Sequence, residues 1–508
     1  MRTKKKSMQS GVCALLSVSM LFGAGAASAQ AVQGDAPALK VARRLAASPA
    51  TAPVPLANLP VAVAPMAFAS APAPAPLVAS SPAPFQMRKV AASASALGLS
   101  ADAGERLRAY LDETVRKALE LSAEAREANA NWKAAEYDID QAKGQRWPQV
   151  QVGVSSPTAT FGSGANSNSG TRSAAGNLSV TTPVYDWGRL SATIDSRTET
   201  SKAAYQAAQQ VRQKIAYDTV SALLEQRRHQ AALEASQGYV TRMEELVDML
   251  SQIVQSDRGR ASELTQARAR RLQAVTQRDA ITAKLREVQV SLVKLVGEEV
   301  QWPADLAWEM RPVVLQDALV AGAEHPAMQQ ARAEAKAAGL YAESVKAGRL
   351  PQLNWVVGKS TQEDSLGNKQ PWSTGLSLQW NAFQGGSGRA SERAAFERAA
   401  AGEEKAEASA RDLAYRLRTS AEQRDASASR AGEYSELIQE TDRVRKIFFE
   451  QWYHLGKRTL LDVLTAESDH YGNQSAQVTT RFDAEAADLR MRADSAMLLD
   501  WLRGAKVL

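Results

Sequence analysis

The chain has 508 residues, of which 44% are hydrophobic and 23% are charged, so most of it is expected to fold, either as two or three ordinary domains or as one large elongated one. Its single cysteine, Cys13, excludes a disulfide framework and a cysteine-based zinc site, and its four histidines are far apart. The H-E-x-x-H, P-loop and G-x-S-x-G motifs are absent from the sequence. We therefore expect neither an enzyme nor a bound metal or cofactor.

Residues 1–29 have the pattern of a secretory signal peptide, with a basic start, an apolar stretch and an A-x-A cleavage site ending at Ala29. Cys13 precedes most of the apolar stretch, so we do not expect it to carry a lipid. Removal of this segment lowers the formal net charge from +6 to +2, and that near balance argues against nucleic-acid binding. No later segment holds the run of about 20 apolar residues that a transmembrane helix needs. The sequence thus predicts a periplasmic, extracellular or outer-membrane protein.

Residues 30–100 are predicted to be a Pro/Ala-rich disordered linker, because eleven of the 19 prolines lie between Pro37 and Pro84. Proline is then absent from 184–302 and from 372–508, which are rich in helix-favouring residues. A helix over about 188–256 would be on the order of 100 Å long. Apolar residues in these windows follow heptad spacing, which predicts coiled coils, and those in one coil are Val240, Met243, Val247, Leu250 and Val254. Between Ala390 and Ala431 the buried stripe is expected to be largely alanine.

Two pairs of strands are predicted, each about 8–11 residues long, which is the length of a tilted strand across a bilayer. Apolar and polar residues alternate in all four, starting at Val150, Leu178, Leu353 and Leu376. A turn-rich polar stretch joins the members of each pair, as in an outer-membrane barrel. The alternation alone fits two ordinary surface hairpins on a helical protein equally well.

The two halves of the chain repeat each other. Arg146-Trp147-Pro148-Gln149-Val150 recurs 203 residues later as Arg349-Leu350-Pro351-Gln352-Leu353, and Tyr185-Asp186-Trp187-Gly188 recurs 198 residues later as Phe383-Gln384-Gly385-Gly386. Each half is then predicted to contain, in this order, a helix, a hairpin, a long helix, a glycine turn and another helix. This tandem duplication predicts two repeats, 101–300 and 301–508.

These markers resemble the TolC family of outer-membrane efflux proteins over roughly residues 105–505. The closest stretch is Leu455-Gly456-Lys457-Arg458-Thr459-Leu460-Leu461-Asp462-Val463-Leu464, which is similar to the second periplasmic tip of that family. The resemblance implies a mainly α fold with a transmembrane β-barrel. In it a homotrimer forms one 12-stranded barrel, four strands coming from each protomer, and the helices continue as a coiled-coil tunnel through the periplasm. An open sheet edge in lipid leaves backbone groups unpaired, so four strands require such oligomerisation if they lie in a membrane.

The resemblance also implies a site at the tip turns Gly259 and Gly456, where family members close and meet a periplasmic adaptor. Glycine suits both turns because it tolerates positive φ. The residues that match the family latch are Arg458, Ser262 and Glu263, and Asp462 matches an aspartate ring at the constriction, where carboxylates would attract cations. The family's second acidic ring falls at Thr465, so a thinner ring is expected here.

The expected function is therefore an outer-membrane exit channel of a tripartite type I secretion system. Its partners would be the adaptor and an inner-membrane ABC or proton-driven pump. The leaning towards type I secretion comes from the expected absence of a lipid-anchored cysteine. A multidrug efflux duct is the alternative within the same class. A secreted coiled-coil tether is a further alternative, but it gives no reason for two membrane-length hairpins at equivalent positions.

Overall fold

The structure, a computed structural model, describes residues 101–155, 174–361 and 368–504. All of them belong to one compact unit, Val90–Leu508. The predicted signal peptide and Pro/Ala-rich linker lie outside the described residues, as do most of the two turn-rich stretches that join the predicted strand pairs.

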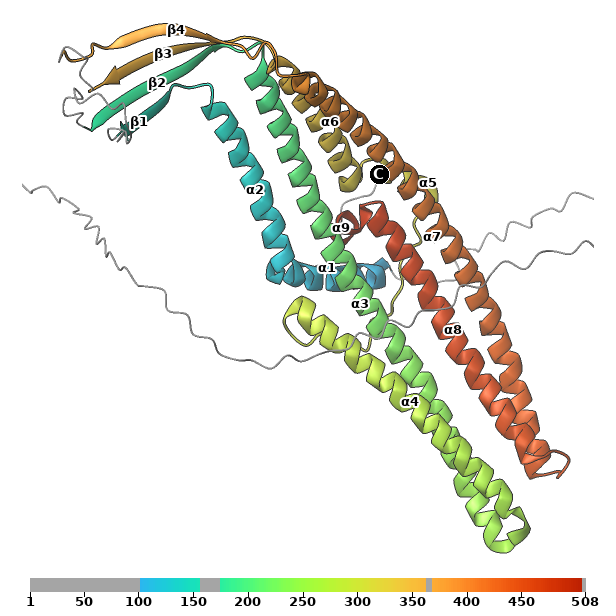
Figure 1. The fold of residues 1–508 in the computed structure, drawn as a ribbon. Coiled ribbons are helices and arrows are strands. Elements are labelled where there is room, and N and C mark those ends of the chain that lie inside the picture. The colour runs from blue at the N-terminus through green and yellow to red at the C-terminus, as the bar shows by residue number, and fades with distance from the viewer. Residues whose placement is uncertain (1–100, 156–173, 362–367, 505–508) are drawn as a thin grey trace, which may run out of the picture. The chain divides into compact units, whose positions relative to one another are not determined.

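Fourteen elements make up the described part of the chain, and their order is nearly the same in its two halves (Figure 1). In the first half they are α1 (Ala101–Leu121), α2 (Ala123–Gly144), β1 (Gln149–Ser155), β2 (Ala175–Tyr185), α3 (Arg189–Ser256), the 3-10 turn η1 (Arg258–Arg260) and α4 (Ala261–Val296). In the second half they are α5 (Leu315–Ala323), α6 (Pro326–Ala347), β3 (Gln352–Ser360), β4 (Ser373–Gln379), α7 (Ser387–Tyr453), α8 (Leu460–Asp494) and α9 (Met497–Leu502).

The two long helices arise as predicted. Helix α3 has 68 residues and α7 has 67, so each is on the order of 100 Å long. Each begins after a glycine with positive φ, which is 81° at Gly188 and 87° at Gly386. Only glycine adopts that conformation without a steric penalty, so it sets the turn from strand to helix. Among the residues that the structure describes, no helix is both long and apolar enough to cross a membrane.

Heptad residues lie inside the coils as predicted, with Val240, Met243 and Leu250 all buried. The expectation of a largely alanine stripe in α7 is only partly right. Ala395, Ala399 and Ala421 are buried, but leucine and serine share the stripe with them. Leucine appears where α7 meets the short helix α5, and there Leu413 and Leu417 fill an apolar cluster that alanine would leave open.

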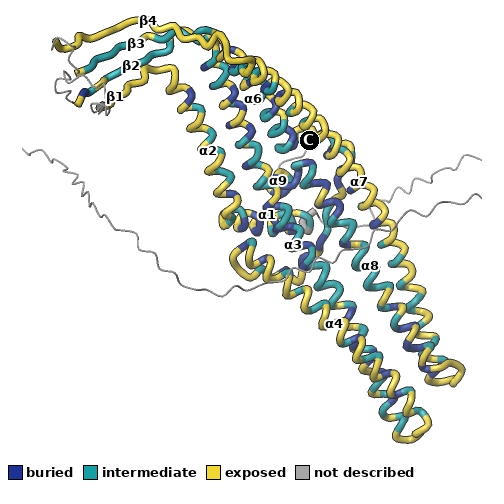
Figure 2. The backbone as a smooth tube through the Cα atoms, in the orientation of Figure 1, coloured by how far each residue is buried: buried dark blue, intermediate teal, exposed yellow. Residues whose placement is uncertain are grey.

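The long helices pack in a row in the order α4, α3, α8 and α7 (Figure 1). Nearer the strands, α2 and α6 pack on α3, and α6 also packs on α7. The buried residues lie between these helices, while much of the outer surface of α4 and α7 is exposed (Figure 2). One apolar cluster joins the ends of α3, α4, α7 and α8 that lie farthest from the strands, around Met243, Leu264, Trp452 and Val463.

The strands form one antiparallel sheet in the order β1-β2-β3-β4. Both hairpins predicted from the sequence are present, and β2 pairs with β3 although more than 160 residues separate them in the chain. Strands β2 and β3 have 11 and 9 residues, within the expected range, whereas β1 and β4 have 7 each. Within the described strands, β1 and β4 have a hydrogen-bonded neighbour on one side only.

Candidate functional site

The sheet has one apolar face and one polar face. Its register aligns Val150 with Val180 and Val357, and Trp355 with Leu376, so apolar side chains stack across neighbouring strands. The residues between them, which point to the other face, are almost all polar or glycine, and they include Gln149, Gln151, Ser179, Thr181, Asn354, Gly358, Ser373 and Ser377. Alternation of this kind gives a sheet one side suited to hydrocarbon and one suited to water.

The apolar face is largely uncovered in the single chain. Val152 is 79% exposed and Leu376 is 69% exposed, far from the near-zero values of the leucines between the helices. A contiguous exposed apolar surface marks contact with a membrane or a partner. The exposed apolar residues of the sheet therefore form one surface, and they are not single residues scattered over the protein.

Aromatic side chains gather where the strands meet the helices. Trp147, Tyr185, Trp187, Trp380 and Phe383 are all exposed there. Two of them are anchored to the backbone of the turn between α6 and β3, since Trp187 Nε1 donates to the Pro351 carbonyl at 2.7 Å and Trp380 Nε1 donates to the Arg349 carbonyl at 3.1 Å. Aromatic rings with one anchored polar atom are typical of the girdle at a membrane–water interface.

The first tip turn differs from the expectation. Gly259 lies in the 3-10 turn η1 and has no positive φ, so the reason given for a glycine there is wrong. The turn is instead stabilised by Asp257, whose side chain accepts the Gly259 backbone N–H at 3.0 Å. A Cβ at position 259 would lie 3.1 Å from that carboxylate oxygen, so close approach of the cap is what favours glycine.

The second tip turn follows the expectation, because Gly456 has φ of 59°. Asp462 lies one turn into α8, where it forms a reciprocal capping box with Thr459. Its carboxylate accepts the Thr459 backbone N–H at 3.1 Å, and its own N–H donates to Thr459 Oγ1 at 3.3 Å. The carboxylate therefore stabilises the start of α8, whatever else it does.

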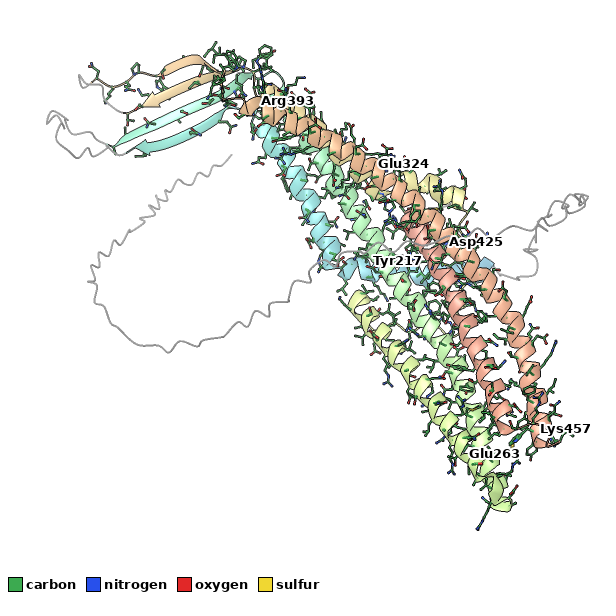
Figure 3. The ribbon with its side chains drawn as sticks, turned by 45° about the vertical axis from the view of Figure 1, so that its right-hand side comes forward. Tyr217, Glu263, Glu324, Arg393, Asp425 and Lys457 are labelled. Carbon is green, nitrogen blue, oxygen red and sulfur yellow. The ribbon has the colours of Figure 1, made fainter. Side chains whose placement is uncertain are left out.

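Within one chain the predicted latch residues are not brought together. Arg458 donates to Gln451 Oε1 at 3.2 Å, and its guanidinium lies 4.2 Å from the centre of the Phe448 ring. Glu263 instead pairs with Arg260 at 3.3 Å. Ser262 is exposed at the start of α4 (Figure 3 labels the neighbouring Glu263).

Other charged residues link the two coils near the tips, and no motif in the sequence marks them. Arg242 on α3 donates to Glu467 on α8 at 2.9 Å, and Arg260 in the first turn lies 5.3 Å from the centre of the Trp452 ring on α7. Their one local signal is a glutamate three residues after each arginine, which is too common on helices to be informative.

The described residues include no group of three or more His, Cys, Asp or Glu side chains placed to hold a metal ion. Two of the histidines have structural partners. His325 Nδ1 accepts the Ala327 backbone N–H at 3.0 Å as the cap of α6, and burial lowers the pKa of its ring. His470 Nδ1 lies 3.2 Å from Thr441 Oγ1.

An amphipathic sheet whose outer strands each have one neighbour among the described strands, continued by helices on the order of 100 Å long, is the architecture of an outer-membrane channel protomer. The model of the family described as outer membrane efflux protein matches residues 114–298 and 315–493, and the chain belongs to this family. The protein is thus an outer-membrane efflux channel, and channels of this family work as trimers with an adaptor and an inner-membrane pump.

Solved structures of outer-membrane channels share the fold. The chain is similar to the outer membrane protein VceC from Vibrio cholerae, with 20% identity, a TM-score of 0.68 and coverage of 78% of this chain and 98% of that one. It is also similar to the CmeC channel of Campylobacter jejuni, with 14% identity, a TM-score of 0.65 and coverage of 76% and 85%. The open state of MtrE from Neisseria gonorrhoeae gives 15% identity, a TM-score of 0.63 and coverage of 76% and 88%. No curated protein sequence matches the chain.

The two faces of β4 give a matched pair of substitutions. Leu376→Lys places a charge in the middle of the apolar face, which costs roughly 2–4 kcal/mol per strand at the bilayer midplane. Ser377→Lys adds the same charge to the polar face, where water can reach it. We expect the first variant to be depleted from the outer-membrane fraction and the second to be recovered like wild type. Equal recovery of both variants would contradict the assignment of the faces.

Proposed function

We propose that the protein is the trimeric outer-membrane exit channel of a tripartite type I secretion system. Three sheets would close one 12-stranded barrel, with the polar faces lining the lumen and the apolar faces against lipid. The observation that carries this proposal is the sheet itself, which is amphipathic, uncovered on its apolar face and unpaired at both described edges. Free edges in a bilayer are too costly to persist, and joining β1 of one protomer to β4 of the next satisfies them.

Gate opening is proposed to occur at the tips. The row α4-α3-α8-α7 leaves α4 and α7 as its outer members, so in a ring of protomers these two helices would meet. Arg458 follows α7, while Ser262 and Glu263 begin α4. The proposed latch is therefore a contact between neighbouring protomers, with the glycine turns at Gly259 and Gly456 as the surface for the adaptor. In the single chain, Arg458 contacts Gln451 and Phe448, and Glu263 pairs with Arg260. In the proposed trimer, a pair between Arg458 and Glu263 of neighbouring protomers would replace these local contacts.

The type I assignment rests on the position of the single cysteine, Cys13, which is not expected to carry a lipid anchor. A multidrug duct uses the same trimer and the same tips. Protein cargo and small-molecule cargo therefore have to be distinguished by an experiment in the cell.

Arg458→Ala is expected to raise the conductance of the channel in a planar bilayer, because it removes the cation of the latch. An exposed ion pair worth up to about 1 kcal/mol shifts a closed–open equilibrium by roughly fivefold. Arg443→Ala is the control, since Arg443 is an exposed cation on α7, the helix that Arg458 follows, and it pairs with Glu440 at 2.8 Å. Equal conductance of the Arg458 variant and wild type would remove Arg458 from the gate.

Asp462→Asn is expected to weaken block by multivalent cations, because the proposed ring loses three negative charges. The amide keeps an oxygen that can accept the Thr459 N–H, so most of the helix cap remains. Thr459→Ala is the complementary control, because it removes the hydroxyl half of the cap and keeps the carboxylate. Block that weakens in the Thr459 variant but not in Asp462→Asn would mean that the cap, and not a ring of charge, is what matters.

A strain lacking the protein separates the two kinds of cargo. We expect one or a few large proteins to disappear from the culture supernatant, while susceptibility to dyes and antibiotics stays unchanged, and the wild-type gene should restore secretion. Hypersensitivity with an intact secretome would replace type I secretion by multidrug efflux. Loss of both functions would indicate one exit shared by several pumps.

A further inference from the structure

The four described strands contain one charged residue, Lys359 of β3. It belongs to the apolar face, because it lies opposite Leu178 of β2, which in turn lies opposite Val152 of β1. The residues that alternate with these on the described strands, and so form the polar face, carry no charge. The one charge of the sheet is therefore on the face assigned to lipid and not on the face assigned to water.

Lys359 lies at the outer end of the sheet. It is the last residue but one of β3, and β3 runs away from the helices (Figure 1). The helices extend into the periplasm, so this end of the strand is at the outer surface of the membrane. A lysine on the lipid face of a barrel is costly at the bilayer midplane and nearly free of cost close to the interface. The position of Lys359 thus corresponds to the level of the outer headgroups.

A tryptophan marks the same level. Ser373 lies opposite Gly358, so Trp372, which is 62% exposed, is one residue further out, at the height of Lys359. Trp372 is eight residues from Trp380 of the aromatic group beside the helices, which is about 26 Å along a strand at 3.3 Å per residue. With a strand tilt of about 40°, this distance spans about 20 Å of membrane, close to the roughly 25 Å apolar band of outer-membrane barrels. Lys359 therefore lies beyond the hydrocarbon and within reach of headgroups.

The Lys359 ammonium has donors to offer. Its Nζ donates to the Gln370 backbone carbonyl at 2.5 Å, which is its only partner among the residues that the structure describes. An ammonium carries three N–H donors. The four described strands contain no aspartate or glutamate that could neutralise it. A hollow of about 410 Å³ lies beside it, and Leu178, Gln370 and Pro371 are among the residues that line this hollow.

Phosphate is the anion that fits this environment. The outer leaflet of the outer membrane is built largely from lipopolysaccharide, a glycolipid whose headgroup carries phosphate groups above its acyl chains. Lysine binds phosphate as a compact point charge, and basic residues at the membrane surface recognise anionic headgroups. A cation at headgroup level, directly above an uncovered apolar surface, matches both parts of such a lipid.

We propose that Lys359 binds a phosphate group of lipopolysaccharide, with one site on each protomer. The acyl chains of the bound lipid lie on the apolar face below the lysine, over Leu178 and Val152. This inference rests on the proposed function, because it needs the apolar face to be turned to lipid. The bound lipid holds the barrel at a fixed depth in the outer leaflet.

Lipid binding to the protein extracted from outer membranes tests the site. Native mass spectrometry in mild detergent should count one lipopolysaccharide per wild-type protomer. Lys359→Gln should weaken the binding of added lipopolysaccharide roughly tenfold, the effect of losing a charge-assisted contact, and Lys359→Arg should preserve it. Lys369→Gln is the matched control, since Lys369 is an exposed lysine in the segment that leads into β4 at the same end of the sheet.

The phosphate is tested from the side of the lipid. Lipopolysaccharide from which the phosphate groups have been removed should bind the wild-type protein as weakly as the intact lipid binds Lys359→Gln. Inorganic phosphate at millimolar concentration should displace little of the intact lipid, because it makes no contact with the apolar face. Complete displacement by inorganic phosphate would make this a site for the free ion and would overturn the inference.

Three further results would overturn it. Unchanged binding by Lys359→Gln would mean that this lysine only faces water. An equal loss in Lys359→Gln and Lys369→Gln would indicate general attraction between a basic rim and an anionic membrane. Binding that does not depend on phosphate would leave the apolar face alone responsible. A conducting trimer that binds no lipopolysaccharide contradicts this inference only, whereas a protein that neither forms trimers nor conducts in a bilayer contradicts the proposed function.

Discussion

The backbone N–H and C=O groups at the edges of the sheet must find partners, and the rest of the structure depends on this requirement. Strands β1 and β4 each have one edge without a described neighbour, and the faces between them are sorted into apolar and polar. In hydrocarbon every N–H and C=O must find a partner, so a four-stranded sheet cannot remain alone. Closure with other copies satisfies the edges and turns the polar faces inward. Oligomerisation is thus a requirement of this sheet and not an addition to it.

The helical part obeys a different rule, because it has to be stable and also able to move. Apolar clusters around Leu223 and around Met243 give the helices their cohesion. Charged contacts between the coils are placed beside these clusters, and each arginine that reaches the other coil has a second partner on its own coil. Such contacts add orientation to the packing. The apolar clusters therefore hold the two coils to each other, while the charged contacts set their orientation.

The sequence predicted well those features that depend on local patterns. Heptad spacing predicted the helix over about 188–256, which is α3, and alternation at Val150 and Leu376 predicted the strands. The buried stripe of α7 was predicted less well, since a neighbouring helix determines where leucine replaces alanine at Leu413. Gly259 was misinterpreted because a 3-10 turn with an aspartate cap and a turn with positive φ look alike in sequence.

The site residues show the limit of sequence reasoning more clearly. Asp462 was predicted as a member of a charge ring, and Thr459 three residues earlier, with which it forms a capping box, was not weighed. The pair of Arg242 and Glu467 could not be found, because 225 residues separate them and neither stands out from the many charges on the helices. The proposed latch joins separate chains, so neither the sequence nor one protomer can show it.

The most direct test of the account is the mass of the protein extracted from outer membranes in mild detergent, measured by light scattering with the detergent contribution subtracted. We predict a particle of three chains, whose stability depends on the apolar face of the sheet. A particle of one chain that stays folded in detergent and in membranes would mean that the edges of β1 and β4 are satisfied in some other way. That result would contradict the shared barrel and the channel built on it.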